Sequence, residues 1–189
     1  MHILVIDNYD SFTYNLVHYL EKYEGIKTSV FLNDKLTLEQ AAEFDAILIS
    51  PGPGLPEHAG ITLPLLQKYA PTKKILGVCL GLQAMGICFG AKLKNLKQVQ
   101  HGIAQPTVIV KPDLLFANIP NEFECGRYHS WVVDEDDFPD SLEITAIDKE
   151  NNIMAAKHKQ FNLRGVQFHP ESVLTPYGEQ LVYNWLFHC

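Results

Sequence analysis

The sequence predicts an α/β fold: an open, mostly parallel sheet with helices on both faces, and a small antiparallel β element in the second half. Two observations predict it. Short continuous apolar runs, typical of strands covered on both faces, alternate with helical patterns through the first 90 residues. After residue 100 the β-rich runs are separated by polar turns, which indicates antiparallel hairpins. No repeat or linker interrupts the chain, so residues 1–189 are expected to form one domain.

The first half contains four expected strands and four expected helices. The strand runs are residues 3–6, 28–32, 46–50 and 74–78. The helical patterns are residues 14–20, 37–44, 62–69 and 80–89. Thr37 and Gln40 have the spacing of a capping box, while Gly25 and Gly90 are placed to end helices. This order of elements predicts βαβ units and therefore a parallel sheet.

The second half is expected to be mainly β structure. Its β-rich runs are residues 107–111, 127–133, 142–148 and 153–158. Polar turns such as residues 134–137 and 150–152 separate them. A buried strand over residues 163–168 and a helix over residues 177–187 complete the chain.

Composition excludes several classes of partner and environment. The net charge is −7, so the basic face that nucleic acid requires is not expected. The longest uncharged apolar stretch, residues 75–91, is broken by four glycines and a glutamine, so no membrane span is expected. Residues 1–7 lack the features of a signal peptide, and the four cysteines have no C-x-x-C pair or framework spacing. We therefore expect reduced thiols in a cytoplasmic protein.

Cys79 stands between an expected strand and an expected helix, and Gly77 and Gly81 flank it. This G-x-C-x-G pattern has the form of a nucleophile elbow, in which a reactive residue sits on a sharp turn between small neighbours. A position at a helix N-terminus favours a thiolate. The alternative is a small side chain buried in a core strand, because free cysteine is among the most buried residue types.

The segment Gly165 to Ser172, GVQFHPES, supplies the base that a cysteine nucleophile needs. A strand delivers His169 at its carboxyl end, and Glu171 two positions later can face the same side. Glu171 would then orient the imidazole while the other ring nitrogen faces the thiol. Taken alone, the same residues could form an ordinary polar turn, but their combination with Cys79 at strand ends favours a catalytic group.

A rigid loop, Pro51 to Gly54, follows the third expected strand. Its glycines allow a substrate to approach the backbone closely, and an amide from this loop together with that of Leu80 could form an oxyanion hole beside Cys79. No Gly-Lys-Ser/Thr sequence follows, which argues against a phosphate loop. Histidines 2, 58 and 158 are expected at the surface, and no histidine pair has metal-ligand spacing, so we expect neither a metal nor another cofactor.

These motifs resemble the class I glutamine amidotransferases, whose catalytic triad is Cys-His-Glu, and the resemblance covers essentially the whole chain. It implies a flavodoxin-like fold and a reaction in which Cys79 attacks the side-chain amide of L-glutamine. His169 would then transfer protons and Glu171 would orient it. The residues implied to line the glutamine pocket or the oxyanion hole are Gly52, Pro53, Gly54, Leu80, Gln83, Ser130 and Trp131.

Two further stretches, residues 7–16 and 127–130, resemble the glutaminase subunits of anthranilate synthase and aminodeoxychorismate synthase. That resemblance implies a separate chorismate-binding synthase subunit that receives ammonia, in tryptophan or folate synthesis or both. The sequence departs from the family at Leu82, Ile103 and Trp131, none of which belongs to the triad. A free-standing cysteine hydrolase of the same fold, a glutaminase subunit of another amidotransferase and a non-catalytic binding module remain alternatives.

Overall fold

The structure is a computed structural model that describes residues 1–189. Its main strands are β1 (His2–Asp7), β2 (Lys27–Leu32), β3 (Ala46–Ile49), β4 (Lys74–Val78), β6 (Ile103–Ile109), β7 (Glu122–Arg127), β9 (Leu142–Ile147), β10 (Ile153–His158) and β11 (Leu163–Val166). They form one sheet in the order β2-β1-β3-β4-β11-β10-β9-β6-β7. Two short strands, β5 (Leu93–Asn95) and β8 (Trp131–Val133), pair as a separate antiparallel ribbon.

The sheet is parallel from β2 through β11 and antiparallel from β10 through β7. The predicted fold class, a mostly parallel sheet with helices and an antiparallel addition, is confirmed. The antiparallel strands β10, β9, β6 and β7 continue the edge of the parallel sheet, and only the β5–β8 ribbon is separate from it. The last parallel strand, β11, lies beside β4, so the end of the chain returns to the centre of the molecule.

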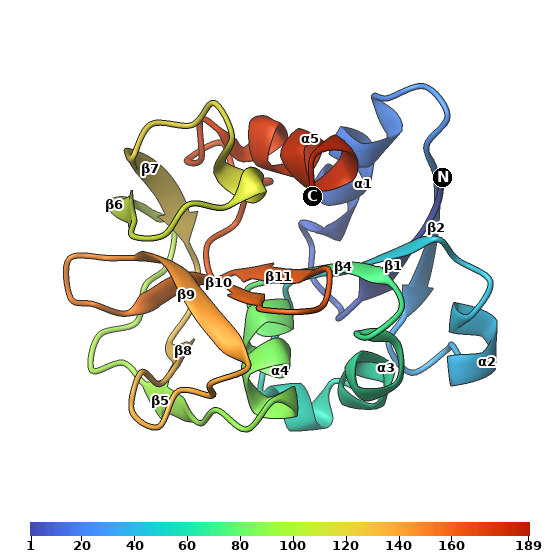
Figure 1. Cartoon of the computed structure of the whole chain (residues 1–189), viewed down its shortest axis with the longest axis horizontal. Helices are drawn as coiled ribbons and strands as arrows, with labels where there is room; N and C mark the ends of the chain where they lie inside the picture. Colours follow the sequence, from blue (N-terminus) through green and yellow to red (C-terminus); the bar gives the residue numbers. More distant parts are fainter.

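Five helices flank the sheet: α1 (Thr13–Glu21), α2 (Leu38–Ala41), α3 (Thr62–Tyr69), α4 (Leu80–Cys88) and α5 (Gly178–Phe187). Helices α1 and α5 lie over one face, whereas α3 and α4 lie over the other (Figure 1). The predicted capping box is present, because the side chains of Thr37 and Gln40 each accept a hydrogen bond from the other residue's backbone amide.

Two hydrophobic clusters cover the two faces of the sheet. The cluster under α1 and α5 includes Val5, Leu16 and Trp185, all fully buried. The cluster under α3 and α4 includes Ile6 and Met85. Val5 and Ile6 are neighbours in β1, so their side chains point to opposite faces, and both faces are covered. Burying a side chain of this size contributes about 1.5–3 kcal/mol each, which makes the central strands a rigid support for their ends.

The structure corrects two details of the sequence analysis. Residues 127–133, expected as one β run, leave the sheet at Tyr128–Ser130 and re-enter β structure in the β5–β8 ribbon. His158, expected at the surface, is buried at the end of β10, where its ring stacks on Phe161 with centroids 4.0 Å apart. Its Nδ1 accepts hydrogen bonds from the backbone amides of Gln160 and Phe161, at 3.1 and 3.0 Å, and so closes the β10–β11 hairpin.

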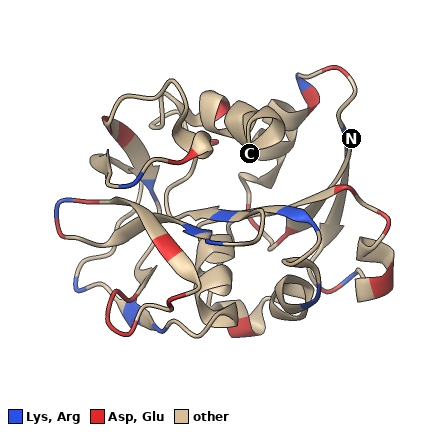
Figure 2. Cartoon of the chain, in the orientation of Figure 1, with Lys and Arg blue, Asp and Glu red and all other residues tan.

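Charged side chains are distributed along the loops and helix surfaces. Figure 2 shows acidic and basic residues interspersed, with the acidic loop of residues 134–137 close to lysines of the segment before β5 and of β5 itself. Such exposed pairs contribute about 0–1 kcal/mol each, so they shape the surface more than they stabilise the fold. None of the five helices is long and apolar enough to traverse a lipid bilayer.

Candidate active site

The site lies where the parallel strands end. Asp7 ends β1, Ser50 directly follows β3, and Cys79 directly follows β4. The segment after β11 brings His169 to the same edge, because β11 and β4 are adjacent and parallel. Ligands of open α/β sheets bind at this edge, outside the carboxyl ends of the strands.

Cys79 occupies a strained turn between β4 and α4. Its backbone has φ 52° and ψ −101°, in the region that side-chain-bearing residues rarely adopt. Conformations of this kind cost about 1–3 kcal/mol and persist where the surroundings hold them. Here the Cys79 amide donates to the Val166 carbonyl at 2.7 Å, and the Cys79 carbonyl accepts from the Gln83 amide at 3.1 Å. The thiol therefore sits at the N-terminus of α4, beside amide groups that have no acceptor within the helix.

The two glycines that flank Cys79 are required by the tightness of this turn. A Cβ added to Gly77 would lie 2.5 Å from the carbonyl carbon and oxygen of Gly81. A Cβ added to Gly81 would lie 2.9 Å from the carbonyl oxygen of Ile49. The G-x-C-x-G pattern thus has a steric cause: the strand, the turn and the helix pass each other at backbone contact distance.

His169 and Glu171 form a buried pair in the segment after β11. The two side chains meet at 2.6 Å between His169 Nδ1 and Glu171 Oε1, while His169 Nε2 has no hydrogen-bond partner. The backbone of His169 is fixed on both sides: its amide donates to Gly126 O at 3.0 Å, and its carbonyl accepts from Thr175 Oγ1 at 2.6 Å. Such a pair leaves Nε2 available to a third group.

The protonation of His169 depends on its two neighbours. Burial lowers its pKa, but interactions with the Cys79 thiol and the Glu171 carboxylate outweigh burial and raise the pKa to about 10. The imidazolium form is therefore favoured when a negative charge lies beside the ring. That charge balance suits a thiolate–imidazolium pair of the kind found in cysteine nucleophiles.

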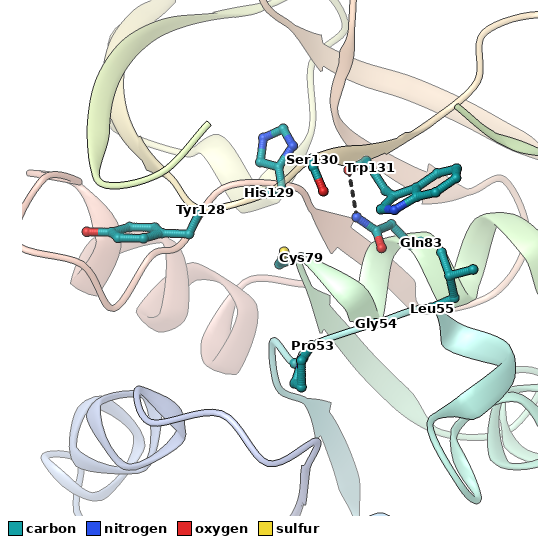
Figure 3. A pocket seen from close by; sticks show the side chains of 10 residues that line it. Pro53, Gly54, Leu55, Cys79, Gln83, Tyr128, His129, Ser130 and Trp131 are labelled. Carbon is teal, nitrogen blue, oxygen red and sulfur yellow. Dashed lines mark hydrogen bonds between the residues drawn. The ribbon is translucent and has the colours of Figure 1, made fainter. Parts of the chain in front are cut away.

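A cavity of about 240 Å³ opens on one side of Cys79 (Figure 3). The residues that line it are Gly52, Pro53, Gly54, Leu55, Cys79, Gln83, Tyr128, His129, Ser130 and Trp131. In Figure 3 Cys79 lies between the Pro53–Leu55 segment and the Tyr128–Trp131 segment, which form opposite walls. Gln83 Nε2 donates to the Trp131 carbonyl at 2.8 Å and so joins α4 to the second wall.

A second cavity, of about 360 Å³, opens on the His169 side of Cys79. Four residues line both cavities: Gly52, Pro53, Cys79 and Tyr128. The second cavity is otherwise lined by the turn after β1, by Pro51, by His101 and by His169. The Tyr128 ring lies 4.9 Å from that of His169 and 5.7 Å from those of Phe12 and His101. Cys79 is thus reached from two directions.

Most of the residues predicted for the site meet here. The predicted nucleophile, the Gly52–Gly54 loop, Gln83, Ser130 and Trp131 all line the first cavity. The predicted base, His169, lines the second, with Glu171 buried behind it. Leu80 is buried and lines neither cavity, so the structure gives its side chain no contact with a substrate there.

Sequence reasoning gave no role to Tyr128, His129 or Gln167, which are part of the site. Tyr128 and His129 lie in the stretch 127–130, whose resemblance to the synthase glutaminases implies no function for these two side chains. Burial, and then the positive charges of Arg127 and His169, lower the pKa of His129 to about 4, so its ring is neutral near pH 7. Gln167 shares the strand run of residues 163–168 with another polar residue, Arg164, so the sequence offered no distinctive signal for its place in the site.

The functional groups gathered in the site suit acyl-transfer chemistry. No three His, Cys, Asp or Glu side chains gather in a way that could hold a metal ion. A thiol, a histidine–carboxylate pair and free amides at a helix N-terminus are the components of nucleophilic catalysis on a carbonyl group.

Comparisons with known proteins agree with this geometry. The family model of glutamine amidotransferase class-I matches residues 4–189. The chain is 44% identical over 189 residues to aminodeoxychorismate synthase component 2 of Escherichia coli, covering 97% of this chain and 98% of that protein. It is 43% identical over 192 residues to anthranilate synthase component 2 of Pseudomonas aeruginosa, covering 97% and 94%. A solved structure from Thermoplasma acidophilum, provisionally assigned to a GMP synthase, has a TM-score of 0.87 at 24% identity, covering 98% and 92%, and supports the fold.

Proposed function

The chain belongs to the class I glutamine amidotransferase family, and we propose that it is the glutaminase subunit of a synthase that aminates chorismate. In this proposal one amidotransferase domain over residues 1–189 hydrolyses L-glutamine, and a separate synthase subunit uses the ammonia. The relatives named above, at 43–44% identity over nearly their full length, are components of anthranilate synthase and of aminodeoxychorismate synthase. The product is accordingly anthranilate, 4-amino-4-deoxychorismate or both.

The observation that carries the proposal is the position of Cys79 between a cavity and a buried histidine–carboxylate pair. Cys79 is held at φ 52° on the turn before α4, and His169 Nδ1 lies 2.6 Å from Glu171 Oε1. The adjoining cavity of about 240 Å³ has room for a small polar substrate such as an amino acid. A structural cysteine needs neither the strained turn nor a base beside it.

We assign the acylation step to Cys79 and His169. The Cys79 thiolate adds to the side-chain carbonyl carbon of glutamine, and the carbonyl electron pair moves to oxygen. The backbone amides of Gly54 and Leu80 are the proposed donors to that oxyanion, the first from the loop and the second from the start of α4. As the tetrahedral adduct collapses, the C–N bond breaks and His169 Nε2 gives its proton to the departing nitrogen. Ammonia leaves, and a glutamyl thioester remains on Cys79.

Deacylation reverses the role of His169. The neutral imidazole takes a proton from water, and the resulting hydroxide adds to the thioester carbonyl. The C–S bond then breaks, its electron pair returns to sulfur, and glutamate leaves as the second product. Glu171 holds Nδ1 throughout, so that Nε2 always faces the reacting atoms.

We propose that the synthase subunit binds over the second cavity. Its lining includes exposed apolar side chains, of which Tyr9 is 55% exposed and Phe12 is 36% exposed. Val173, two residues after Glu171, is 97% exposed. Phe12 and Tyr128 continue the lining toward Cys79. A synthase subunit docked here would enclose the route by which ammonia leaves, and exposed apolar side chains around a cavity are typical of interfaces. The four unpaired cysteines favour a reducing compartment, which we take to be the cytoplasm.

Reconstitution tests the proposal. The purified chain is combined with chorismate-using synthase subunits of the anthranilate and aminodeoxychorismate types, and each aminated product is measured with glutamine or with ammonium salt as the nitrogen source. We expect glutamine-dependent product with at least one of these partners. Cys79→Ala should remove the glutamine-dependent product and leave the ammonia-dependent product unchanged, because the synthase carries its own chemistry.

Labelling with an electrophilic glutamine analogue tests independently which cysteine is the nucleophile. It should label Cys79 alone, since burial raises the pKa of the Cys88 and Cys125 thiols and keeps them protonated. Glutamine hydrolysis that never supports product with any synthase subunit would favour the alternative, a free-standing hydrolase of the same fold. Labelling of Cys88 or Cys125 with Cys79 inert would contradict the assignment of the nucleophile.

A further inference from the structure

A buried amide side chain faces the sulfur of Cys79. Gln167 follows β11 directly and is fully buried, and its Nε2 lies 3.5 Å from Cys79 Sγ. Its backbone is held by β10, because the Gln167 amide donates to the Met154 carbonyl at 2.9 Å. A primary amide in a core costs free energy unless its donors and acceptors have partners. The place of Gln167 beside the thiol therefore calls for an explanation.

The orientation of this amide follows from a second glutamine. Gln83 Nε2 lies 2.8 Å from the Trp131 carbonyl and 3.3 Å from Gln167 Oε1. An NH₂ group has two hydrogens, so Gln83 can donate to both acceptors at once. Gln167 Oε1 is thereby engaged as an acceptor, which directs its NH₂ group toward Cys79. The three side chains form a buried relay from the wall of the first cavity to the nucleophile.

From this relay we infer that Gln167 is a positioning residue, which holds Cys79 Sγ in place and stabilises it as a thiolate by N–H donation. The inference rests on the proposed function of Cys79 as the nucleophile. A thiolate accepts a hydrogen bond far more strongly than a neutral thiol, because the bond is then charge-assisted and lies in a low-dielectric site. The same donor assists deacylation, in which the C–S bond breaks and its electron pair returns to sulfur.

Gln167 complements His169 and does not duplicate it. The histidine carries a proton to and from the reacting atoms, whereas an amide donates a hydrogen bond and exchanges no proton. Its contribution is accordingly independent of the protonation of the imidazole. The titratable groups that face Cys79 or line its two cavities are His169 with Glu171 behind it, His129, Tyr128, Tyr9, Asp10 and His101. A substitution of Gln167 leaves all of them in place.

The test compares Gln167→Met and Gln167→Glu with the wild-type chain. Methionine keeps the volume and removes the N–H donor, while glutamate keeps the shape and puts oxygen acceptors against the sulfur. Iodoacetamide alkylation of Cys79 is followed by mass spectrometry across pH, and glutamine hydrolysis is measured in the presence of the synthase subunit. For Gln167→Met we expect the alkylation midpoint to rise by about 0.5–1 pH unit and kcat to fall about tenfold, with KM for glutamine within about twofold. Gln167→Glu should raise the midpoint further.

Asn184→Leu is the matched control. Asn184 is another fully buried amide, and its Nδ2 donates to the carbonyls of Leu115 and Ala117 at 2.9 and 2.8 Å, away from both cavities. This variant should unfold more easily and yet keep the wild-type alkylation profile. If Gln167→Met does not fold, Gln167→Asn is measured in its place. Asparagine keeps the amide, but its side chain is one methylene shorter and moves the N–H donor away from the sulfur. It should shift the alkylation midpoint in the same direction.

The outcomes separate the inference from the proposed function. A wild-type alkylation profile and wild-type kcat in Gln167→Met would overturn the positioning role, whatever the partner protein. A shifted profile in a chain that never hydrolyses glutamine would support the role of Gln167 toward the thiol and contradict the glutaminase function instead. A profile shifted equally by Asn184→Leu would also overturn the inference, since general loosening of the core would then explain the shift.

Discussion

Asn8 and Ser50 are joined by two hydrogen bonds at the ends of neighbouring strands. The Asn8 amide donates to Ser50 Oγ at 2.9 Å, and Asn8 Nδ2 donates to Ser50 O at 2.8 Å. Asn8 Oδ1 in turn accepts from Asn33 Nδ2 at 2.9 Å and from Thr62 Oγ1 at 3.2 Å. All four side chains are buried. The turn after β1, which rims the second cavity, is thus tied directly to the Pro51–Gly54 loop of the first.

The first prediction concerns this connection. Asn8→Ala should lower the stability by about 1–3 kcal/mol, because two buried donors lose their acceptor. It should also reduce the stimulation of glutamine hydrolysis by the synthase subunit, since the rim and the loop would move independently. The measurement is glutaminase activity with and without the partner. Asn33→Ala is the control: it removes one bond to Asn8 from the far side and should keep most of the stimulation. Equal loss of stimulation in both variants would mean that stability alone matters.

A second prediction uses a close backbone approach in the loop. A Cβ on Gly52 would lie 2.4 Å from the Asn8 Cβ and 2.6 Å from the Asn8 carbonyl oxygen, so Gly52→Ala must displace the loop. Displacing one oxyanion donor costs about 10²–10³-fold in turnover, and we expect a kcat loss of that order. Gly25→Ala is the control. Gly25 has a positive φ, of 80°, but no atom lies within 4 Å of an added Cβ. That variant should lose about 1 kcal/mol of stability and keep its kcat. A Gly52→Ala variant with wild-type kcat would remove the loop from the mechanism.

The third prediction grades the members of the triad. His169→Ala should cost nearly as much glutaminase activity as Cys79→Ala, because the thiol loses its base and the leaving amine loses its acid. Glu171→Ala should cost less, since the imidazole keeps its chemistry and loses only the 2.6 Å contact that orients it. Rates of glutamate formation in the three variants provide the comparison. Wild-type activity in His169→Ala would refute the role of His169 as the base. A Glu171→Ala variant as inactive as Cys79→Ala would mean that the carboxylate does more than orient the imidazole.

The first half of the fold was predictable because its signals are local. The residues of β1 and β3 are continuous apolar runs, and the capping box of α2 can be read from Thr37 and Gln40 alone. The elbow was also readable, since its two glycines stand within two residues of Cys79. Where a pattern and its physical cause occupy the same short segment, sequence reasoning succeeds.

The second half depends on contacts that the sequence does not display. Pro106 argues against a strand, yet β6 runs through it, because β9 pairs with β6 only at Val108 and Ile109 and the side of β6 away from β7 has no strand partner at Pro106. The break at residues 128–130 follows from tertiary structure, since Tyr128, His129 and Ser130 line the cavity instead of continuing β7. The contact of Gln167 with Cys79 joins residues 88 positions apart, and no local pattern encodes it.

The fourth prediction is a pH dependence of stability. His129 is buried without a hydrogen-bond partner on either ring nitrogen, and its pKa is lowered to about 4, first by burial and then by Arg127 and His169. In the unfolded chain the ring titrates near 6.5. As pH falls from about 6.5 to about 4, the unfolded state binds a proton that the folded state refuses, so the free energy of unfolding decreases, by at most about 3 kcal/mol.

His129→Gln tests this dependence. Denaturant unfolding at about pH 7, 5.5 and 4.5 should show a shallower acid loss in the variant than in the wild type. The remaining slope should include His158, whose pKa is lowered by burial and which therefore acts in the same direction. His18→Gln, on the exposed side of α1, is the matched substitution with which the slope of His129→Gln is compared. Identical slopes in wild type and His129→Gln would show that His129 is not the group being titrated.

The last prediction is that the isolated chain is a poor glutaminase and that the partner makes it competent. A glutaminase that runs without an acceptor wastes glutamine, so coupling of the two sites is expected. We expect the Pro51–Gly54 loop to be the means, because turning one of its peptides would remove the second proposed donor to the oxyanion. The rim of the second cavity and this loop meet through Asn8 and Ser50, so docking at Tyr9 or Phe12 acts on the loop directly. One misplaced donor holds turnover down by about 10²–10³-fold.

Glutamine hydrolysis is therefore measured for the chain alone, with the synthase partner, and with both this partner and chorismate. We expect a rise at each addition, approaching about 10²-fold in the complete mixture. Val173→Asp should weaken the stimulation, because it puts a charge on an exposed apolar side chain two residues from Glu171, and it should leave the alkylation of Cys79 unchanged, because Val173 lies outside both cavities. If the isolated chain already works at the full rate of the complex, the loop is preformed and gating by the partner is wrong. The assignment of Cys79, His169 and Glu171 would survive that result, since it depends on the geometry around the thiol and not on what covers the rim.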